Sequence, residues 1–140
     1  FEAFTSSNEE DGNDARGVMR VPHGAGLNPN SFTFSIMVRE LVVDDLGVEV
    51  ASSGGTAPDG TRRGWKLIFN RCGEWEFRIA TGETPTRWST VYATATVLGS
   101  WSHIAAVYDE ATGTQELWVE STLDETHGRA TDVNYEPNVR

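Results

Sequence analysis

The sequence has little that could staple a fold or build a thiolate metal site, because Cys72 is its single cysteine. One cysteine excludes an intrachain disulfide and a cluster of cysteine ligands around zinc. Long apolar runs are also missing, and none approaches the ~18 residues of a membrane-spanning helix. Positive charge is scarce: 11 lysines and arginines stand against 21 aspartates and glutamates, a net charge of −10. Because such a field repels phosphate backbones and anionic lipid, we expect neither nucleic acid as a partner nor membrane insertion.

The sequence also lacks the patterns of a histidine metal site and of a serine hydrolase. The three histidines, His23, His103 and His127, have no metal-like spacing, and no Gly-x-Ser-x-Gly elbow of a serine hydrolase occurs. The chain begins with Phe1 rather than methionine and carries no targeting segment. From this we expect a processed, exported product that works outside the cell or at its surface.

The sequence does show alternation of apolar and polar residues. No window has a sustained helical period, and the best helical candidate, residues 40–46, is too short. Residues 65–70 and 74–80 flank a Gly-containing turn and predict a β-hairpin. We expect the side chains of the hairpin that face the core to be Trp65, Leu67, Phe69, Trp75, Phe77 and Ile79. Other predicted strands are 17–21, 32–39, 48–52, 90–97, 103–108 and 115–120, with loops at 6–14 and 52–63.

Short strands punctuated by 14 glycines and five prolines are typical of an antiparallel sandwich or barrel. A chain of 140 residues with 38% hydrophobic and 23% charged residues suits one globular domain, residues 1–140.

Three segments resemble laminin G-like and concanavalin A-like jelly-roll domains. Residues 18–22 read Val-Met-Arg-Val-Pro, residues 27–35 read Leu-Asn-Pro-Asn-Ser-Phe-Thr-Phe-Ser, and residues 99–109 read Gly-Ser-Trp-Ser-His-Ile-Ala-Ala-Val-Tyr-Asp. The chain departs from the family at Met37, where a tryptophan is usual, and lacks the Asn-Gly turn expected after Val119. The resemblance implies an all-β, two-sheet antiparallel jelly roll whose members mostly bind glycans, proteins or calcium at the rim.

The resemblance also directs attention to the end of the sequence. In the family, the segment that matches residues 135–138 is followed by strands that close the sheet, whereas this sequence ends at Arg140. We therefore expect a domain that lacks its final strands, with two explanations open: the parent protein continues, or a neighbouring subunit donates a strand. Residues 1–16 would then be an N-terminal extension, with residues 1–5 as the donor strand.

Some relatives in this family are glycoside hydrolases with a Glu-x-Asp-x-x-Glu strand motif. The sequence contains no match to this motif. We therefore expect that the protein is not an enzyme.

Aromatic residues are the main candidates for sugar binding. Trp65, Trp75 and Trp101 are in phase with apolar neighbours, so we expect them in the core. Trp88, beside Arg87 in a polar stretch, and Trp118, out of phase with its apolar neighbours, are the candidate carbohydrate-binding residues.

We expect no bound metal or cofactor, with calcium as the alternative. Its candidate ligands are Asp44, Asp45 and Asp109, although no EF-hand spacing occurs and solvated acidic loops are the simpler interpretation.

These observations favour a non-catalytic extracellular binding and adhesion module whose partner is a glycan or a cell-surface protein. The alternative is a structural subunit of a homopolymeric fibre or sheath assembled by strand donation. A polysaccharide-active enzyme domain is the third hypothesis.

Overall fold

The structure is a computed structural model that describes residues 2–4, 18–20, 29–39, 47–83, 87–93, 99–120, 122–123, 129–131, 134, 135 and 137. These residues contain β-strands and no helix, and every strand pair is antiparallel. The prediction of an all-β fold is confirmed.

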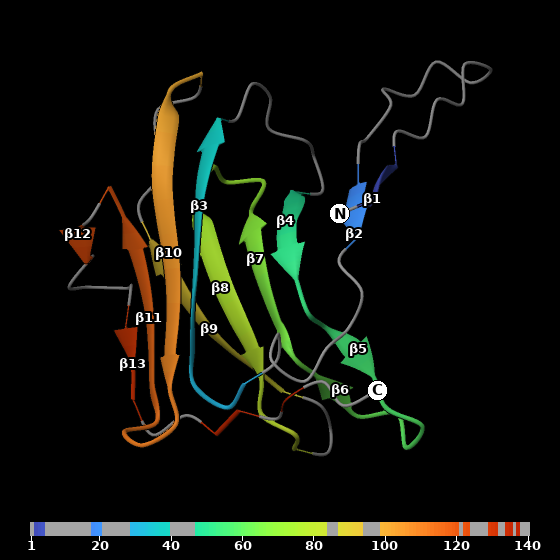
Figure 1. The fold of residues 1–140 in the computed structure, drawn as a ribbon. Coiled ribbons are helices and arrows are strands. Elements are labelled where there is room, and N and C mark those ends of the chain that lie inside the picture. The colour runs from blue at the N-terminus through green and yellow to red at the C-terminus, as the bar shows by residue number, and fades with distance from the viewer. Residues whose placement is uncertain are drawn as a thin grey trace.

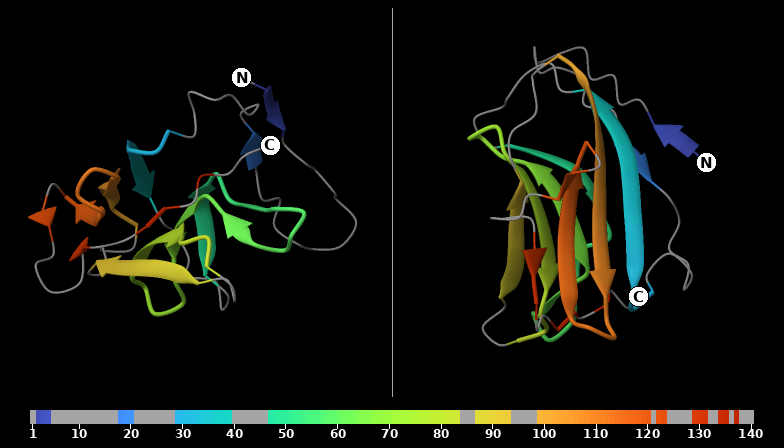
Figure 2. Two further views of the ribbon diagram at one scale, coloured as in Figure 1. Left: turned by 90° about the horizontal axis from the view of Figure 1, so that it is seen from below. Right: turned by 90° about the vertical axis from the view of Figure 1, so that its left-hand side faces the viewer.

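Two sheets form a sandwich (Figure 1, Figure 2). We name the first the front sheet: β12 (Thr122–Leu123), β11 (Thr114–Val119), β10 (Trp101–Asp109) and β3 (Phe32–Arg39), with β13 (Arg129–Ala130) also paired to β11. The back sheet contains β4 (Val48–Ser52), β7 (Trp65–Phe69), β8 (Trp75–Ala80) and β9 (Trp88–Ala93). Two small ribbons complete the strands: β5 (Gly55–Thr56) with β6 (Arg62–Arg63), and β1 (Glu2–Phe4) with β2 (Val18–Arg20).

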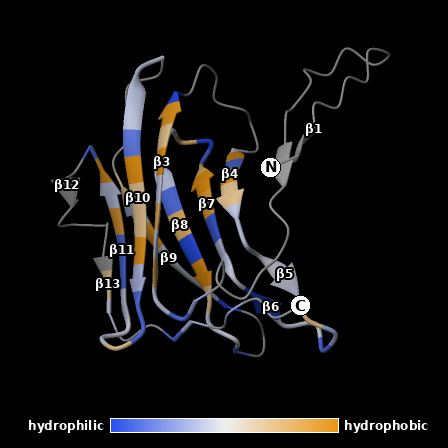
Figure 3. Cartoon of the chain, in the orientation of Figure 1, coloured by the Kyte–Doolittle hydropathy of each residue, from blue (hydrophilic) through white to orange (hydrophobic). Residues whose placement is uncertain are grey.

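The core lies between the sheets because alternate residues of each strand point inward. Figure 3 shows the alternation of apolar and polar residues along β8 and β10. The buried cluster consists of Trp65, Leu67, Phe69, Trp75, Phe77, Ile79, Val91, Ala93, Ile104, Ala106, Tyr108 and Leu117. All six residues predicted to be the inner side of the 65–80 hairpin are in it, so that prediction is confirmed.

Asn70 organises the turn of this hairpin. Its side-chain oxygen accepts hydrogen bonds from the backbone N–H groups of Cys72 (2.9 Å) and Glu74 (3.0 Å). Gly73 has a φ of 80°, a left-handed conformation that costs glycine little. Cys72 is therefore an exposed turn residue.

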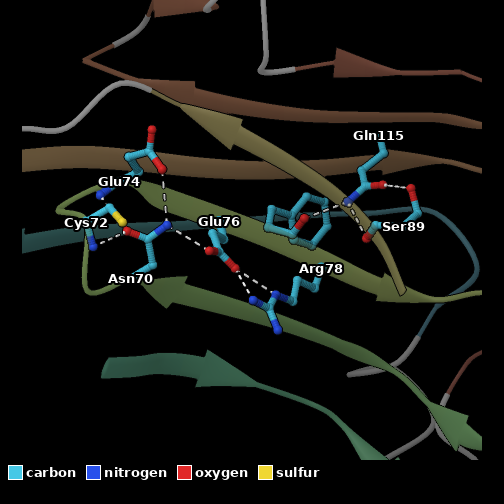
Figure 4. Close-up of polar contacts among 8 residues, drawn as sticks. Asn70, Cys72, Glu74, Glu76, Arg78, Ser89 and Gln115 are labelled. Carbon is cyan, nitrogen blue, oxygen red and sulfur yellow. Dashed lines mark hydrogen bonds and ion pairs between the residues drawn. The ribbon is translucent and has the colours of Figure 1, made fainter. Parts of the chain in front are cut away.

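One hydrogen-bond group links the sheets through the core (Figure 4). Gln115, from the front sheet, is fully buried and donates to the carbonyl of Phe77 (2.8 Å) while accepting from the Ser89 hydroxyl (2.7 Å). Both partners lie in the back sheet. Because a buried amide without partners would be costly, these bonds fix how β11 faces β8 and β9.

Two predictions are wrong. Trp101 was expected in the core but is 62% exposed, because it shares the outward parity of His103 and not the inward parity of Ile104. The segment 52–63, expected to be a loop, contains the whole of a small ribbon, β5–β6. Gly64, which follows the ribbon, has a φ of 88°, and a Cβ there would lie 2.5 Å from the Ser53 carbonyl oxygen, so the bend needs glycine.

At the N-terminal end, β1 pairs with β2 of the same chain and with neither large sheet. The role of residues 1–5 as a donor strand stays a prediction. The predicted loop at 6–14 and the helical candidate at 40–46 lie outside the described residues.

Candidate functional site

The outer face of the front sheet carries the two most exposed large apolar side chains among the described residues, Trp101 (62%) and Met37 (54%). Trp101 pairs with Arg39 across the β10–β3 ladder, and Met37 pairs with His103, the next outward residue of β10. Since paired residues on one face have Cβ atoms about 5 Å apart, these side chains form a continuous surface. We call this surface, together with Trp118 and Ala105, the front face.

Hydrogen bonds hold the polar groups of the front face in place. His103 Nε2 and the Ser35 hydroxyl share a hydrogen bond of 2.7 Å. The backbone N–H of His103 donates to Glu120 Oε1 (3.1 Å), and Arg39 Nε donates to the carbonyl of Gly99 (3.0 Å), next to Trp101. The polar side chains beside the exposed indole are therefore already oriented before any ligand arrives.

Trp118 forms the other end of the front face. It pairs with Ala105, whose opposite partner on β3 is Ser35. The Trp118 indole N–H donates to Glu116 Oε2 at 3.1 Å, so the half-buried ring is held in one orientation. Along β10, Ala105 is four residues from Trp101, which places the two tryptophans about 13 Å apart with small and polar side chains between them.

Trp88, by contrast, lies on the outer side of the back sheet. Trp88 pairs with Ala80, whose side chain is fully buried. The Arg62 guanidinium lies 6.0 Å from the centre of the Trp88 ring. Arg87 is exposed and forms an ion pair with Glu83 at 3.6 Å. One face of the Trp88 ring is therefore covered by a cation–π contact, which leaves less of it open to a ligand.

Near the middle of the same outer side, Glu76 is a charged residue that is only 5% exposed. Its carboxylate accepts hydrogen bonds from Asn70 Nδ2 (2.7 Å) and Arg78 Nε (2.7 Å), and Arg78 also forms an ion pair with it (Figure 4). These bonds compensate the charge and occupy the carboxylate oxygens.

A second carboxylate of this side, Glu49 on β4, is also engaged. Partial burial alone would raise its pKa, but hydrogen bonds from Lys66 and Ser52 hold the pKa of Glu49 below its ordinary value. It is therefore an ionised, paired group rather than a free acid or base.

The candidate sugar-binding residues do not form one site. Trp118 belongs to the front face, whereas Trp88 and Arg87 lie on the opposite side of the sandwich. The residue that sequence reasoning missed is Trp101. The information was present, because Trp101 is an odd number of residues from Ile104, Ala106 and Tyr108 and must point away from them.

Of the calcium candidates, Asp44 and Asp45 lie outside the described residues. Asp109 uses its carboxylate within its own turn, accepting from the Ala111 N–H (3.1 Å) and the Thr112 hydroxyl (2.8 Å). In the part of the chain that the structure describes, no three His, Cys, Asp or Glu side chains are grouped as metal ligands. The same residues contain no helix that is long and apolar enough to cross a membrane.

Comparison with known proteins identifies the fold family. The family model of the concanavalin A-like lectin/glucanases superfamily matches residues 11–138. No curated protein matches the sequence.

Proposed function

The chain belongs to the concanavalin A-like lectin/glucanase superfamily, and from that premise we propose that it is a non-catalytic, extracellular carbohydrate-binding and adhesion module that uses its front face. At the level of the family, the matched domain is a carbohydrate-binding or adhesion-type module. The sugar specificity, the extracellular location and the choice of surface are the proposal.

The observation that carries the proposal is the exposure of Trp101 on a regular strand in the middle of ordered polar groups. A large aromatic side chain that is 62% exposed loses contact area it could bury, so its position favours a ligand that covers it. The apolar face of a pyranose ring suits an indole surface, and sugar hydroxyls need hydrogen-bond partners at its edge.

The polar neighbours supply those partners. The His103–Ser35 pair offers a donor and an acceptor, and the carboxylate of Glu120, just after β11, offers an acceptor near His103. The Glu116 carboxylate offers an acceptor beside Trp118. Because several of these groups are already held by hydrogen bonds, little side-chain entropy would be lost when a sugar binds. Trp118 would contact a neighbouring sugar unit, about 13 Å away along the face.

The absence of catalysis in the proposal rests on how the described carboxylates are used. Glu76 and Glu49 are bound by basic side chains. Glu116 Oε2 accepts from the Trp118 indole N–H, and Glu120 Oε1 accepts from the backbone N–H of His103. These carboxylates are therefore engaged, whereas a glycosidase needs two carboxyl groups, about 5–9.5 Å apart, that are free to act on the scissile bond.

A glycan array followed by titration of the best ligand tests the proposal. We expect Trp101→Ala to weaken binding at least tenfold and Trp118→Ala to weaken it less, with melting temperatures close to that of the native protein. Tyr92→Ala is the matched control, since Tyr92 is an exposed aromatic residue on the outer side of the back sheet. Trp88→Ala and Arg87→Ala test the other surface, and a loss confined to them would contradict the choice of the front face. Titration with and without a chelator tests whether calcium takes part.

The second candidate function is a structural subunit of a fibre or sheath. It is favoured by the long edge of β3, which has no partner among the described strands, and by the N-terminal ribbon, which pairs with no described strand of either large sheet. The mass in solution separates the two functions, because a strand-donating subunit would form open chains rather than a species of fixed size.

A further inference from the structure

Strand β3 is an edge strand of the front sheet that lacks the features by which natural edge strands usually prevent pairing with another strand. Among the strands that the structure describes, β3 pairs with β10 on one side and has no partner on the other. It pairs in register over all eight residues, from Phe32 to Arg39, with no bulge. The segment contains no proline or lysine, and its single charge, Arg39, stands at the end. Natural edge strands are usually short, bulged or charged, because a regular edge is a template for another strand.

The side chains of β3 also indicate an incomplete interior. Its four inward residues, Phe32, Phe34, Ile36 and Val38, are only partly buried, whereas the inward residues of β10 next to them are almost completely buried. Phe32 and Phe34 pack on Trp65 with ring centres 5.6 and 5.0 Å apart. A further strand beside β3 would extend this apolar layer and cover the exposed parts of these side chains.

The back-sheet edge nearest in sequence, β4, does not share these properties. It has five residues, a register irregularity between Glu49 and Ala51, and an outward ion pair between Glu49 and Lys66. Each of these features discourages strand addition. Of these two edges, β3 is therefore the one that favours strand addition.

Two charged side chains indicate which partner fits this edge: Arg39 at the end of β3, and Glu110, which follows β10 and lies beside the beginning of β3. Arg39 ends the strand, and at its beginning Asn30 donates to Glu110 Oε1 (3.1 Å) while the Ser31 hydroxyl accepts from the Glu110 N–H (2.9 Å). If a second β3 pairs antiparallel with Ser35 opposite Ser35, then Arg39 of each copy lies opposite Ser31 of the other. Glu110 is one further strand away, about 10 Å between backbones, within the combined reach of the two side chains. The same register sets Phe34 opposite Ile36 and Phe32 opposite Val38 on the inner side.

We propose that two copies of this chain join edge to edge through β3 as a two-fold symmetric dimer with Ser35 at the axis. In this pairing the inward residues of one copy lie opposite inward residues of the other, and the arginine of each copy lies near the glutamate of the other. A closed two-fold contact requires such a self-complementary surface. The net charge of −10 on each copy opposes association, but physiological salt screens it beyond about 8 Å and leaves the close Arg39–Glu110 contacts. The pairing is made by the backbone edge of β3 and does not require sugar binding, although the outward side chains of Ser35 and Arg39 also belong to the front face.

Cross-linking tests the register directly. In a Cys72→Ser background, which removes the single native thiol, Ser35→Cys is expected to form a covalent dimer under mild oxidation, because residues opposite each other at the axis are within disulfide range. Thr33→Cys is the matched control. It is exposed on the same strand, but in this register the two copies of residue 33 are about 13 Å apart and should not cross-link. Equal cross-linking of both variants, or none by Ser35→Cys, would overturn the proposal.

Sedimentation of the unmodified chain supplies the second test, and we expect a dimer at micromolar concentration and 0.15 M salt. Arg39→Glu should raise the dissociation constant at least tenfold, and Arg39→Glu with Glu110→Arg should restore it. Arg87→Glu makes the same charge change at an exposed arginine of the other sheet and should have no effect on the dimer. A monomer throughout would overturn the proposal. Loss of association on deleting residues 1–5 would indicate strand donation instead and would overturn it as well.

Discussion

Phe77 is the residue on which the packing of the sandwich depends most. It is fully buried on β8, its ring lies edge-on to Phe32 of the other sheet, and its carbonyl accepts the bond from Gln115. Phe77→Ala should lower the free energy of unfolding by about 3–5 kcal/mol, because the cavity lies between two sheets that hydrogen bonds hold in place. Chemical denaturation measures this. Met37→Ala removes an exposed side chain and should cost less than about 0.5 kcal/mol. A loss below about 1 kcal/mol for Phe77→Ala would contradict the assignment of the inner face.

Tyr135 gives the protein a pH dependence at the alkaline end. Burial, and to a smaller extent the nearby Tyr108, raises the pKa of Tyr135 to about 12, although a hydrogen bond with Ser53 opposes the shift. Its ring packs against those of Phe32 and Tyr108. An unfolded chain loses the phenolic proton near pH 10. The stability that the protonated Tyr135 contributes is therefore complete below pH 10 and is lost as the pH rises from about 10 to 12.

The measurement is the unfolding free energy at pH 9 and pH 11.5 for the native protein and for Tyr135→Phe. The decrease should be smaller in the variant, which keeps the ring but has no proton to lose. Burial raises the pKa of Tyr108 as well, so part of the decrease should remain. Identical decreases in both proteins would show that Tyr135 does not carry the effect.

At the scale of single residues, the sequence predicted inward positions well wherever the alternation ran through several residues. It failed for Trp101, because both alternating sets of residues 101–108 contain apolar side chains, so being in phase with Ala105 and Val107 did not identify the inward set. The hydrogen bonds of Gln115 and Glu76 could not be predicted, since their partners come from other strands and depend on register.

Among the elements, the β7–β8 hairpin depends on Asn70. Its side chain satisfies two backbone N–H groups of the turn and donates to both Glu74 and the buried Glu76. Asn70→Ala should cost about 2–3 kcal/mol of unfolding free energy, because it removes the turn contacts and one partner of a buried carboxylate.

Asn70→Asp separates the two contributions. It keeps the acceptor for the turn but places a third carboxylate beside Glu74 and Glu76, so it should be destabilising at pH 7 and recover partly towards pH 4. Thermal melts at both pH values measure this. A cost below about 0.5 kcal/mol for Asn70→Ala would mean that the turn forms without its side chain.

Element prediction succeeded for strands of five or more residues and for β2, which lies within the predicted strand 17–21, and it failed for the two-residue strands. The boundaries shifted by a few residues, as for β9, which begins at Trp88 where the prediction began at residue 90. The two-residue strands β5, β6, β12 and β13 were missed, because two residues cannot show a period. Their pairing is set by the neighbouring ladder, which a single sequence does not display.

For the whole molecule, the family contains both lectins and glucanases, so catalysis is an experimental question. We predict no hydrolysis of common β-glucans, because the sequence lacks the spaced carboxylate motif and the described carboxylates on the back sheet are paired with basic groups. Reducing-sugar release from β-glucans should equal that of a heat-killed control. Release above the control that disappears in Glu76→Gln would contradict the non-catalytic proposal.

The most direct measurement of the central claim is a titration of the best array glycan that follows the five tryptophan indole N–H signals by NMR. Each signal is assigned by a single Trp→Phe variant, which replaces one indole at a time. The account predicts that the Trp101 signal shifts most, that Trp118 shifts with it, and that the buried Trp65 and Trp75 stay unchanged. Shifts confined to Trp88, or saturation of binding with no change at Trp101, would contradict the assignment of carbohydrate binding to the front face.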